Sequence, residues 1–232
     1  MEAQLFDRIQ PRTLRAEIVD MLKDAIVSGK LGPGEHLKES LIAEQMSVSR
    51  IPLREAFRQL EQEGLIVSIP NQGSFVKVFD EKDIREIFTL RGALESLACE
   101  LVLSNGLLEP EDLEHLEHFI DQQREAIDTR DFDRLTKLDM DFHEFICTKS
   151  KSERLLKTWQ SLRAQIQVLF HQRFRTYDWI PQTVETDHSA IMEALRQGDV
   201  QQVAQVHKEI NARVAEECIQ ITQSMGYEHG DD

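Results

Sequence analysis

The stretch SRIPLREAFRQLEQEGLIVSIPNQGSFVKV, residues 49–78, changes its hydrophobic period halfway along and decides the fold of the N-terminal third. Its first half has the period of an amphipathic helix, with Ser49 as a suitable N-cap and Pro52 in the first turn. The apolar face of this helix consists of Leu53, Ala56, Phe57 and Leu60. After Gly64 the pattern is that of two strands joined by the turn 70–73, which predicts a β-hairpin.

Two shorter helical patterns precede this stretch, at residues 13–28 and at about 38–46. Gly32-Pro33-Gly34 separates them, and a tight connection at 47–49 leads into the third helix. Three helices followed by a hairpin predict a winged helix-turn-helix, whose third helix can enter a DNA major groove about 12 Å wide.

From residue 80 onward the pattern is helical almost throughout. The expected helices are 80–103, 109–128, 131–147, 151–176, 181–197 and 199–224. The separators between them are short, so successive helices are expected to be antiparallel neighbours in a bundle. The predicted fold is therefore mainly α, with a winged helix-turn-helix domain at 1–78 and an all-helical domain at 79–232.

The charge distribution favours the first domain as the one that meets a polyanion. The chain carries 27 Lys and Arg against 42 Asp and Glu, a formal net charge of -15. Residues 1–78 have a net charge of -1 and residues 79–232 a net charge of -14. This balance argues against a uniformly basic nucleic-acid coat or a polybasic membrane anchor.

The sequence also predicts a cytoplasmic protein with no membrane partner. It contains no run of about 18 apolar residues, and the start MEAQLFDRIQPR lacks the order of a signal peptide. Three widely spaced cysteines suit reduced thiols better than a disulfide framework.

The third helix carries Arg50, Arg54 and Arg58, which form a slowly spiralling stripe beside the apolar face because residues four apart differ by about 40°. An arginine can bond bidentately to guanine, which discriminates by about 1–3 kcal/mol per good pair. The alternative is a solvated helix face balanced by neighbouring glutamates. The agreement of the cap, the proline and the hairpin favours DNA binding. The predicted DNA-binding residues are Ser49, Arg50, Arg54, Arg58 and Gly73.

The segment LRAEIVDMLKDAIVSGKLGPGEHLKESLIAEQMSVSRIPLREAFRQLEQEGLIVSIPNQGSFV resembles the winged helix of the GntR family of bacterial transcription regulators. IREIFTLRGALESLACELV and the helical remainder resemble its FadR-type branch with an FCD domain. The resemblance implies that Arg50 and Arg54 contact bases or phosphates and that Gly73 lies at the wing tip.

Three positions depart from the family pattern. Ser47 replaces the usual Gly, Ile51 replaces the usual Thr, and Ser40 stands where some relatives have a DNA-contacting Arg. These differences concern the operator sequence rather than the binding mode.

Within the helical domain, Asp139 and His143 are four residues apart, a spacing at which both side chains can reach one metal ion. His188 and His207 lie ten residues before and nine after Gly198, so an antiparallel helix pair would bring them to similar heights. Four candidate metal ligands could therefore converge, with zinc or nickel favoured over magnesium because imidazoles dominate.

The FCD resemblance implies a metal held by an Asp-x-x-x-His pair and later histidines, and Asp139, His143 and His188 match the first three positions. The family's last histidine would fall at about 210–211, where this chain has Ile and Asn. Three alternatives follow: His207 serves as the fourth ligand, water and effector complete a three-ligand site, or metal binding is weak.

Arg91 matches an FCD position associated with the effector pocket, where it would clamp the carboxylate of a small organic acid. The alternative is a helix-surface salt bridge to Glu95, four residues on.

Together these features predict a homodimeric DNA-binding regulator, with repression the commoner family behaviour, whose affinity for double-stranded operator DNA is modulated by an organic acid. An effector-independent dimeric DNA-binding protein is an alternative. A metal-dependent hydrolase is the other, but Glu144 as its base would project about 100° from His143. No P-loop, nucleophile elbow or H-E-x-x-H motif is present, so we expect no enzyme.

Overall fold

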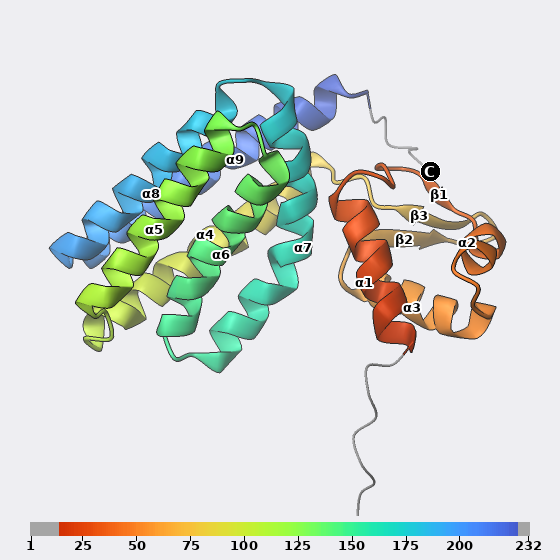
Figure 1. Ribbon diagram of the computed structural model, residues 1–232, viewed down its shortest axis with the longest axis horizontal. Helices are drawn as coiled ribbons and strands as arrows, with labels where there is room; N and C mark the ends of the chain where they lie inside the picture. The colour runs from red at the N-terminus through yellow and green to blue at the C-terminus, as the bar shows by residue number, and fades with distance from the viewer. Residues whose placement is uncertain (1–13, 227–232) are drawn as a thin grey trace, which may run out of the picture. The chain divides into compact units, whose positions relative to one another are not determined.

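The computed structural model describes residues 14–226. Residue 13 of the first predicted helix and the N-terminal stretch examined for a signal peptide lie outside this range. The described chain forms two compact units (Figure 1). The N-terminal unit comprises residues 14–26 and 30–77, and the helical unit comprises residues 27–29 and 78–226.

The N-terminal unit holds three helices and a small antiparallel sheet. Its elements are α1 (Leu14–Val27), β1 (His36–Leu37), α2 (Glu39–Gln45), α3 (Arg50–Gln62), β2 (Ile66–Ile69) and β3 (Gly73–Val76). The sequence did not predict β1, because a two-residue strand has no period to detect. It pairs with β3, giving the strand order β1-β3-β2, and the His36 ring stacks on Phe75 with centroids 4.6 Å apart.

The apolar face predicted for α3 forms the core of this unit, with Leu53, Ala56 and Leu60 fully buried and Phe57 nearly so. Ser49 occupies the N-cap position with an extended backbone, but its side chain makes no capping hydrogen bond. The predicted cap is therefore correct in position and wrong in its bond.

The wing is the β2–β3 hairpin, in which Ile69 pairs with Gly73 and Ile66 with Val76. Gly73 is thus the first residue of β3 rather than the tip of the wing. The tip is the turn 70–72, where Asn71 takes the left-handed conformation with φ 64°. The hairpin pairing continues as far as Gly73, so the predicted tip position is wrong by about two residues.

The helical unit consists of six long helices. They are α4 (Glu81–Ser104), α5 (Pro110–Asp128), α6 (Phe132–Lys149), α7 (Glu153–Thr176), α8 (Ile180–Gln197) and α9 (Val200–Ser224). Each boundary lies within two residues of its prediction. Asp80, Asp131 and Asp199 cap α4, α6 and α9 by accepting a hydrogen bond from the backbone N–H three residues on. Gly198 ends α8 in the left-handed conformation, with φ 67°.

The packing of these helices differs from the prediction at one point. The first helix of this unit, α4, packs mainly against α9, α6 and α7 rather than against α5, which follows it in the chain. A short connection allows consecutive helices to be neighbours, but the burial of side chains on α4 decides its actual partners. Cys99, Cys147 and Cys218 are free thiols buried in this unit.

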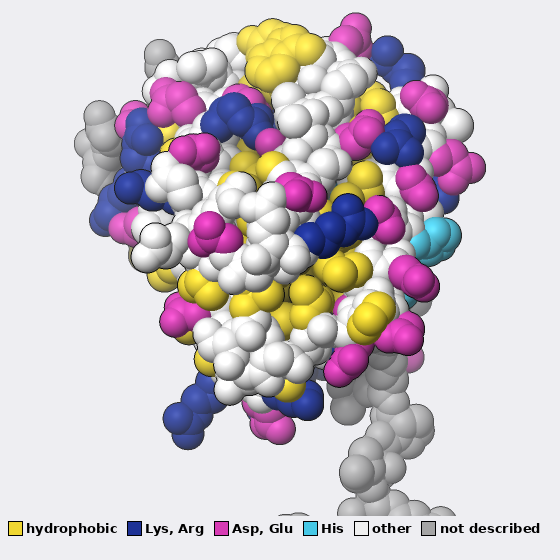
Figure 2. All heavy atoms as spheres, turned by 90° about the vertical axis from the view of Figure 1, so that its left-hand side faces the viewer, with side chains coloured by type: hydrophobic (Ala, Val, Ile, Leu, Met, Phe, Trp, Pro, Cys, Tyr) yellow, Lys and Arg dark blue, Asp and Glu magenta, His cyan; other side chains and the backbone are white. Residues whose placement is uncertain are grey.

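The face of the helical unit in Figure 2 carries interspersed acidic and basic side chains around groups of hydrophobic ones. Within residues 14–226 no helix combines the length and the apolar character needed to cross a membrane.

Candidate functional site

The predicted DNA-binding arginines are all exposed along α3. The Nε atom of Arg54 donates a hydrogen bond to Glu39 Oε2 on α2 at 2.8 Å, and the Arg54 side chain remains 61% exposed. Arg58 lines a surface hollow of about 580 Å³ together with Arg15 and Glu55. The three guanidinium groups are therefore accessible, although Arg54 would have to leave Glu39 to bond fully to DNA.

Two positions that depart from the family pattern lie at the start of this surface. Ser47 has φ 52°, so the tight turn between α2 and α3 requires a left-handed residue, which explains why glycine is usual there. Ile51 is 72% exposed beside Arg50 and Arg54. An exposed apolar side chain at this place is suited to contact a thymine methyl group.

The second candidate site is a buried cluster of five ionisable side chains inside the helical unit. We call it the carboxylate–histidine cluster. It consists of Glu95 on α4, Asp139 and His143 on α6, His188 on α8 and His207 on α9. None of the five is more than 4% exposed. Residues from four helices therefore meet in the core, where uncompensated charge is costly.

Asp139, His143 and His188, which we call the Asp139 trio, converge as the sequence predicts. His143 Nε2 lies 3.1 Å from His188 Nε2, and His188 Nε2 lies 3.3 Å from Asp139 Oδ1. The other ring nitrogen of His188 lies 2.7 Å from Gln123 Oε1. Because an amide oxygen only accepts, we assign the proton of His188 to Nδ1, which leaves the Nε2 lone pair facing the trio.

His207 is placed elsewhere. Its Nδ1 atom lies 3.4 Å from Glu95 Oε2, and Glu95 Oε2 lies 3.2 Å from His143 Nδ1. Glu95, His143 and His207, which we call the Glu95 trio, form a second group with metal-ligand spacing. The structure therefore does not bring His207 together with Asp139 and His188. In the sequence, Glu95 stands out only as a partner of Arg91, because the histidines that it contacts, His143 and His207, are distant in the chain.

Arg91 links the two trios. It donates from Nε to Glu95 Oε1 at 2.8 Å and from a terminal nitrogen to Asp139 Oδ2 at 3.0 Å. The ion pair with Glu95 thus forms, but it is buried and shared with Asp139 rather than being the helix-surface pair of the alternative interpretation. Trp159 Nε1 also donates to Glu95 Oε1 at 3.0 Å.

Burial and charge shift the ionisation of the cluster. Burial alone would raise the pKa of Glu95 and of Asp139, but the charge of the Arg91 guanidinium lowers the pKa of both carboxyls. Burial lowers the pKa of His143 to about 4. The cluster at neutral pH therefore contains two carboxylates, one guanidinium and a neutral His143, an arrangement suited to a cation.

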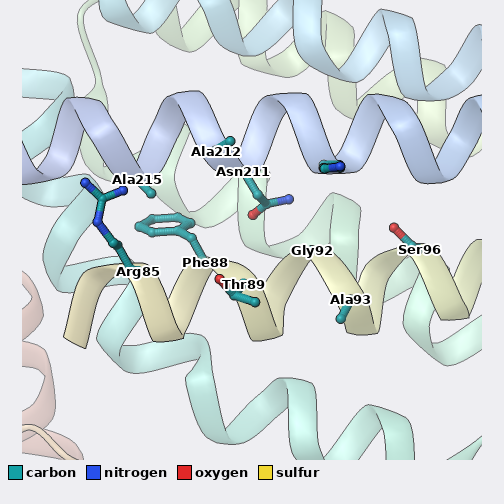
Figure 3. Close-up of a pocket in the computed structure, with 10 residues that line it drawn as sticks. Arg85, Phe88, Thr89, Gly92, Ala93, Ser96, Asn211, Ala212 and Ala215 are labelled. Carbon is teal, nitrogen blue, oxygen red and sulfur yellow. The ribbon is translucent and has the colours of Figure 1, made fainter. Parts of the chain in front are cut away.

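A groove of about 470 Å³ lies between α4 and α9 (Figure 3). It is lined by Arg85, Phe88, Thr89, Gly92, Ala93, Ser96, Lys208, Asn211, Ala212 and Ala215. Gly92 faces Asn211 so closely that an added Cβ would lie 3.2 Å from Asn211 Nδ2. Asn211 donates to the carbonyl of His207 at 2.9 Å. The segment where the family resemblance places a last histidine therefore presents an amide to the groove.

A winged helix-turn-helix joined to a helical bundle with a buried carboxylate–histidine cluster defines the class of DNA-binding regulators that carry a sensing domain. Residues 14–76 match the model of the bacterial regulatory proteins of the gntR family, and residues 86–212 match the FCD domain. The chain belongs to the GntR family and carries an FCD effector-binding domain.

Individual relatives support this family membership. The HTH-type transcriptional regulator YdhC of Bacillus subtilis (strain 168) is 30% identical over 81% of this chain and 83% of its own. The HTH-type transcriptional repressor RspR of Escherichia coli (strain K12) is 27% identical over 89% of this chain and 90% of its own. A transcriptional regulator GntR from Rhodococcus sp. RHA1 has a similar structure, with TM-score 0.74 and 25% identity, over 93% of this chain and 99% of its own.

The chain is therefore a DNA-binding transcription regulator and not an enzyme, since its family and relatives are regulators.

Proposed function

We propose that the protein is a homodimeric repressor whose operator affinity is controlled by a small organic acid bound to a divalent metal ion. Residues 1–78 would bind one half of a pseudo-palindromic operator. Residues 79–232 would hold the effector, the metal and the dimer contacts. Repression is inferred from RspR, a relative named as a repressor. Because operator DNA is cytoplasmic, the proposal places the protein there.

The geometry of the Asp139 trio carries the metal part of the proposal. Its donor atoms come from two helices, and the bond from His188 to Gln123 keeps a lone pair on His188 Nε2 directed at Asp139 Oδ1. Two acceptors that face each other at 3.3 Å repel unless a cation lies between them. One carboxylate and two imidazoles suit zinc or nickel. When bound, the ion supplies an open coordination position for a carboxylate.

The groove between α4 and α9 offers a path for the effector. Its volume of about 470 Å³ falls in the usual range for small-molecule sites, and Arg85 and Lys208 supply positive charge at its walls. Gly92, the neighbour of Arg91 in sequence, has no side chain of its own there, and Asn211, which packs against it, would have to move aside for an effector to pass. An effector carboxylate that bonds to the nitrogens of Arg91 now used by Glu95 and Asp139 would have to replace one of these carboxylates.

Control of the operator requires the effector to bind the DNA-competent and DNA-incompetent forms with unequal affinity. A coupling free energy of about 1–3 kcal/mol would change operator affinity about 5- to 150-fold. The exchange of carboxylates on Arg91 would alter the packing of α4 against α6, and α4 is the first helix after the N-terminal unit.

The DNA-binding part is tested by fluorescence anisotropy with a labelled promoter fragment at several salt concentrations. We expect affinity to fall steeply with salt, and Arg54→Ala to weaken specific binding by about 1–3 kcal/mol. Arg124→Ala, an exposed arginine of the helical unit, is the matched control. An Arg54→Ala protein as tight and selective as the parent would remove Arg54 from the interface.

The metal part is tested by the metal content of protein purified without added metal. We expect close to one ion per chain in the wild type and a large loss in the double variant His143→Ala/His188→Ala. A thermal-shift screen of organic acids on the zinc-loaded protein then tests the effector, since a ligand at 100 times its Kd adds about 2.7 kcal/mol. If no acid shifts the midpoint or the operator affinity, the effector-independent alternative stands. Sedimentation measures the expected dimer.

A further inference from the structure

The Glu95 trio contains three buried polar atoms without a hydrogen-bond partner. They are Glu95 Oε2, His143 Nδ1 and His207 Nδ1. Both nitrogens lie within 3.4 Å of the glutamate oxygen, but neither has the geometry of a hydrogen bond to it. Buried polar atoms are rarely left unpaired, and the convergence of three of them from α4, α6 and α9 needs an explanation.

His143 faces the two trios with opposite ring nitrogens. Its Nε2 is directed at His188, and its Nδ1 is directed at Glu95. A neutral imidazole carries one N–H and one lone pair, so His143 can offer a lone pair to only one side at a time.

Each of the two proton positions leaves one unfavourable contact. With the proton on Nε2, His143 donates to the free lone pair of His188, and its Nδ1 lone pair then faces the carboxylate of Glu95. With the proton on Nδ1, the contact with Glu95 improves, and two imidazole lone pairs then face each other beside Asp139. A cation on the side opposite to the proton removes the remaining repulsion in either case.

Arg91 makes the same kind of contact with both carboxylates. It bonds to one oxygen of Glu95 and to one oxygen of Asp139. The second oxygen of each, Glu95 Oε2 and Asp139 Oδ1, is the atom that faces the histidines. Each carboxylate is thus oriented by Arg91 with one oxygen left for an ion.

His207 is also held in a ligand orientation. Its Nε2 atom lies 3.6 Å from the sulfur of Cys99, which places the opposite nitrogen, Nδ1, toward Glu95. A contact at the second ring nitrogen fixes the orientation of an imidazole, as hydrogen bonds at that nitrogen do in metal-binding histidines.

We propose that Glu95, His143 and His207 form a second site for a divalent transition-metal ion, an alternative to the Asp139 trio. The shared imidazole of His143 makes the two sites mutually exclusive, so each chain holds one ion in one of two positions. The donor set of one carboxylate and two imidazoles is the same on both sides, which suits the same ions. The exclusivity rests on the proposed function of the Asp139 trio, whereas the Glu95 site itself does not.

The test uses full-length protein freed of metal with a chelator and titrated with Co²⁺, followed by calorimetry and by the visible absorption of the bound ion. We expect one Co²⁺ per chain in the wild type and also in His188→Asn, in which only the Glu95 trio is complete. Adding His207→Asn to His188→Asn should then lower affinity by about 100-fold or more. His118, an exposed histidine of α5, gives the matched control His188→Asn/His118→Asn, in which affinity stays unchanged.

The outcomes separate the two proposals. Equal binding by His188→Asn and His188→Asn/His207→Asn overturns the second site, and so does a His188→Asn protein that binds no ion while His207→Asn binds like the wild type. Two ions per wild-type chain overturn the exclusivity. If His207→Asn alone removes the ion while His188→Asn leaves binding unchanged, the Asp139 site fails and the Glu95 site stands. Circular dichroism confirms folding, and Asp139→Asn replaces His188→Asn in the series if the latter does not fold.

Discussion

Arg91→Met removes the charge that orients both buried carboxylates while nearly preserving side-chain volume. Arg91 is 4% exposed, and it pairs with Glu95 at 2.8 Å and with Asp139 at 3.0 Å. Breaking a buried ion pair by removing one partner costs about 3–5 kcal/mol, because the other charge stays buried and uncompensated. Two carboxylates are left here, so we expect a loss at the upper end of that range.

Such a loss is a large part of the roughly 5–15 kcal/mol that stabilises a typical domain. For a unit of this size it lowers the thermal midpoint by about 10 °C or more. Both tryptophans of the chain, Trp159 and Trp179, belong to the helical unit. Their fluorescence during urea unfolding therefore reports on that unit separately from the N-terminal one.

The matched control is Arg85→Met on the same helix. Arg85 pairs with Glu81 and Glu216, but its side chain is 51% exposed, so we expect an unfolding midpoint close to that of the wild type. Saturating zinc should narrow the difference between Arg91→Met and the wild type, because the ion supplies positive charge beside the same carboxylates. An Arg91→Met protein as stable as the wild type without metal would refute the assigned ion-pair role and favour Arg91 as an effector clamp alone.

Three further predictions concern single positions. Ser47→Gly should stabilise the N-terminal unit by about 1 kcal/mol, because glycine adopts the left-handed conformation at φ 52° without the strain of a serine. Thermal unfolding followed by circular dichroism measures the change, and an unchanged midpoint would mean that the turn is not strained. Gly73→Ala should destabilise the wing by about 1–3 kcal/mol and weaken DNA binding, because φ of Gly73 is 107° and the new Cβ would lie 2.7 Å from His36 Nε2. In the control Gly32→Ala the new Cβ meets nothing within 4 Å, so we expect stability and DNA binding to stay unchanged. Protein freed of metal with a chelator should lose up to about 3 kcal/mol of folding stability as the pH falls from 6.5 to about 4, because His143 becomes protonated in the unfolded state and stays neutral in the folded state. His143→Gln should remove this part of the pH dependence.

The local patterns of the sequence determined the elements of both units. The helix ends follow from residues whose effect is local, such as Asp80 and Asp199 at N-caps and Gly198 at a C-terminus. The i, i+4 spacing of Asp139 and His143 places both on one face of a helix in any context, and the structure brings His188 to them. The exposed arginines of α3 likewise follow from the period of its apolar face.

Only the tertiary structure decided which side chains meet between helices. The height estimate for His188 and His207 contained no information on rotation about the helix axes. His207 contacts Glu95, which lies at Nδ1 of His143, whereas His188 lies at Nε2 of the same ring. The spacing of Arg91 and Glu95 left open an effector clamp and a helix-surface pair, because spacing within one helix cannot reveal that three other helices pack against it. Strand β1 and the position of Gly73 depended on pairing across the sheet. Local periodicity specifies an element and its faces, whereas the contacts of a buried site depend on the crossing and rotation of elements distant in the chain.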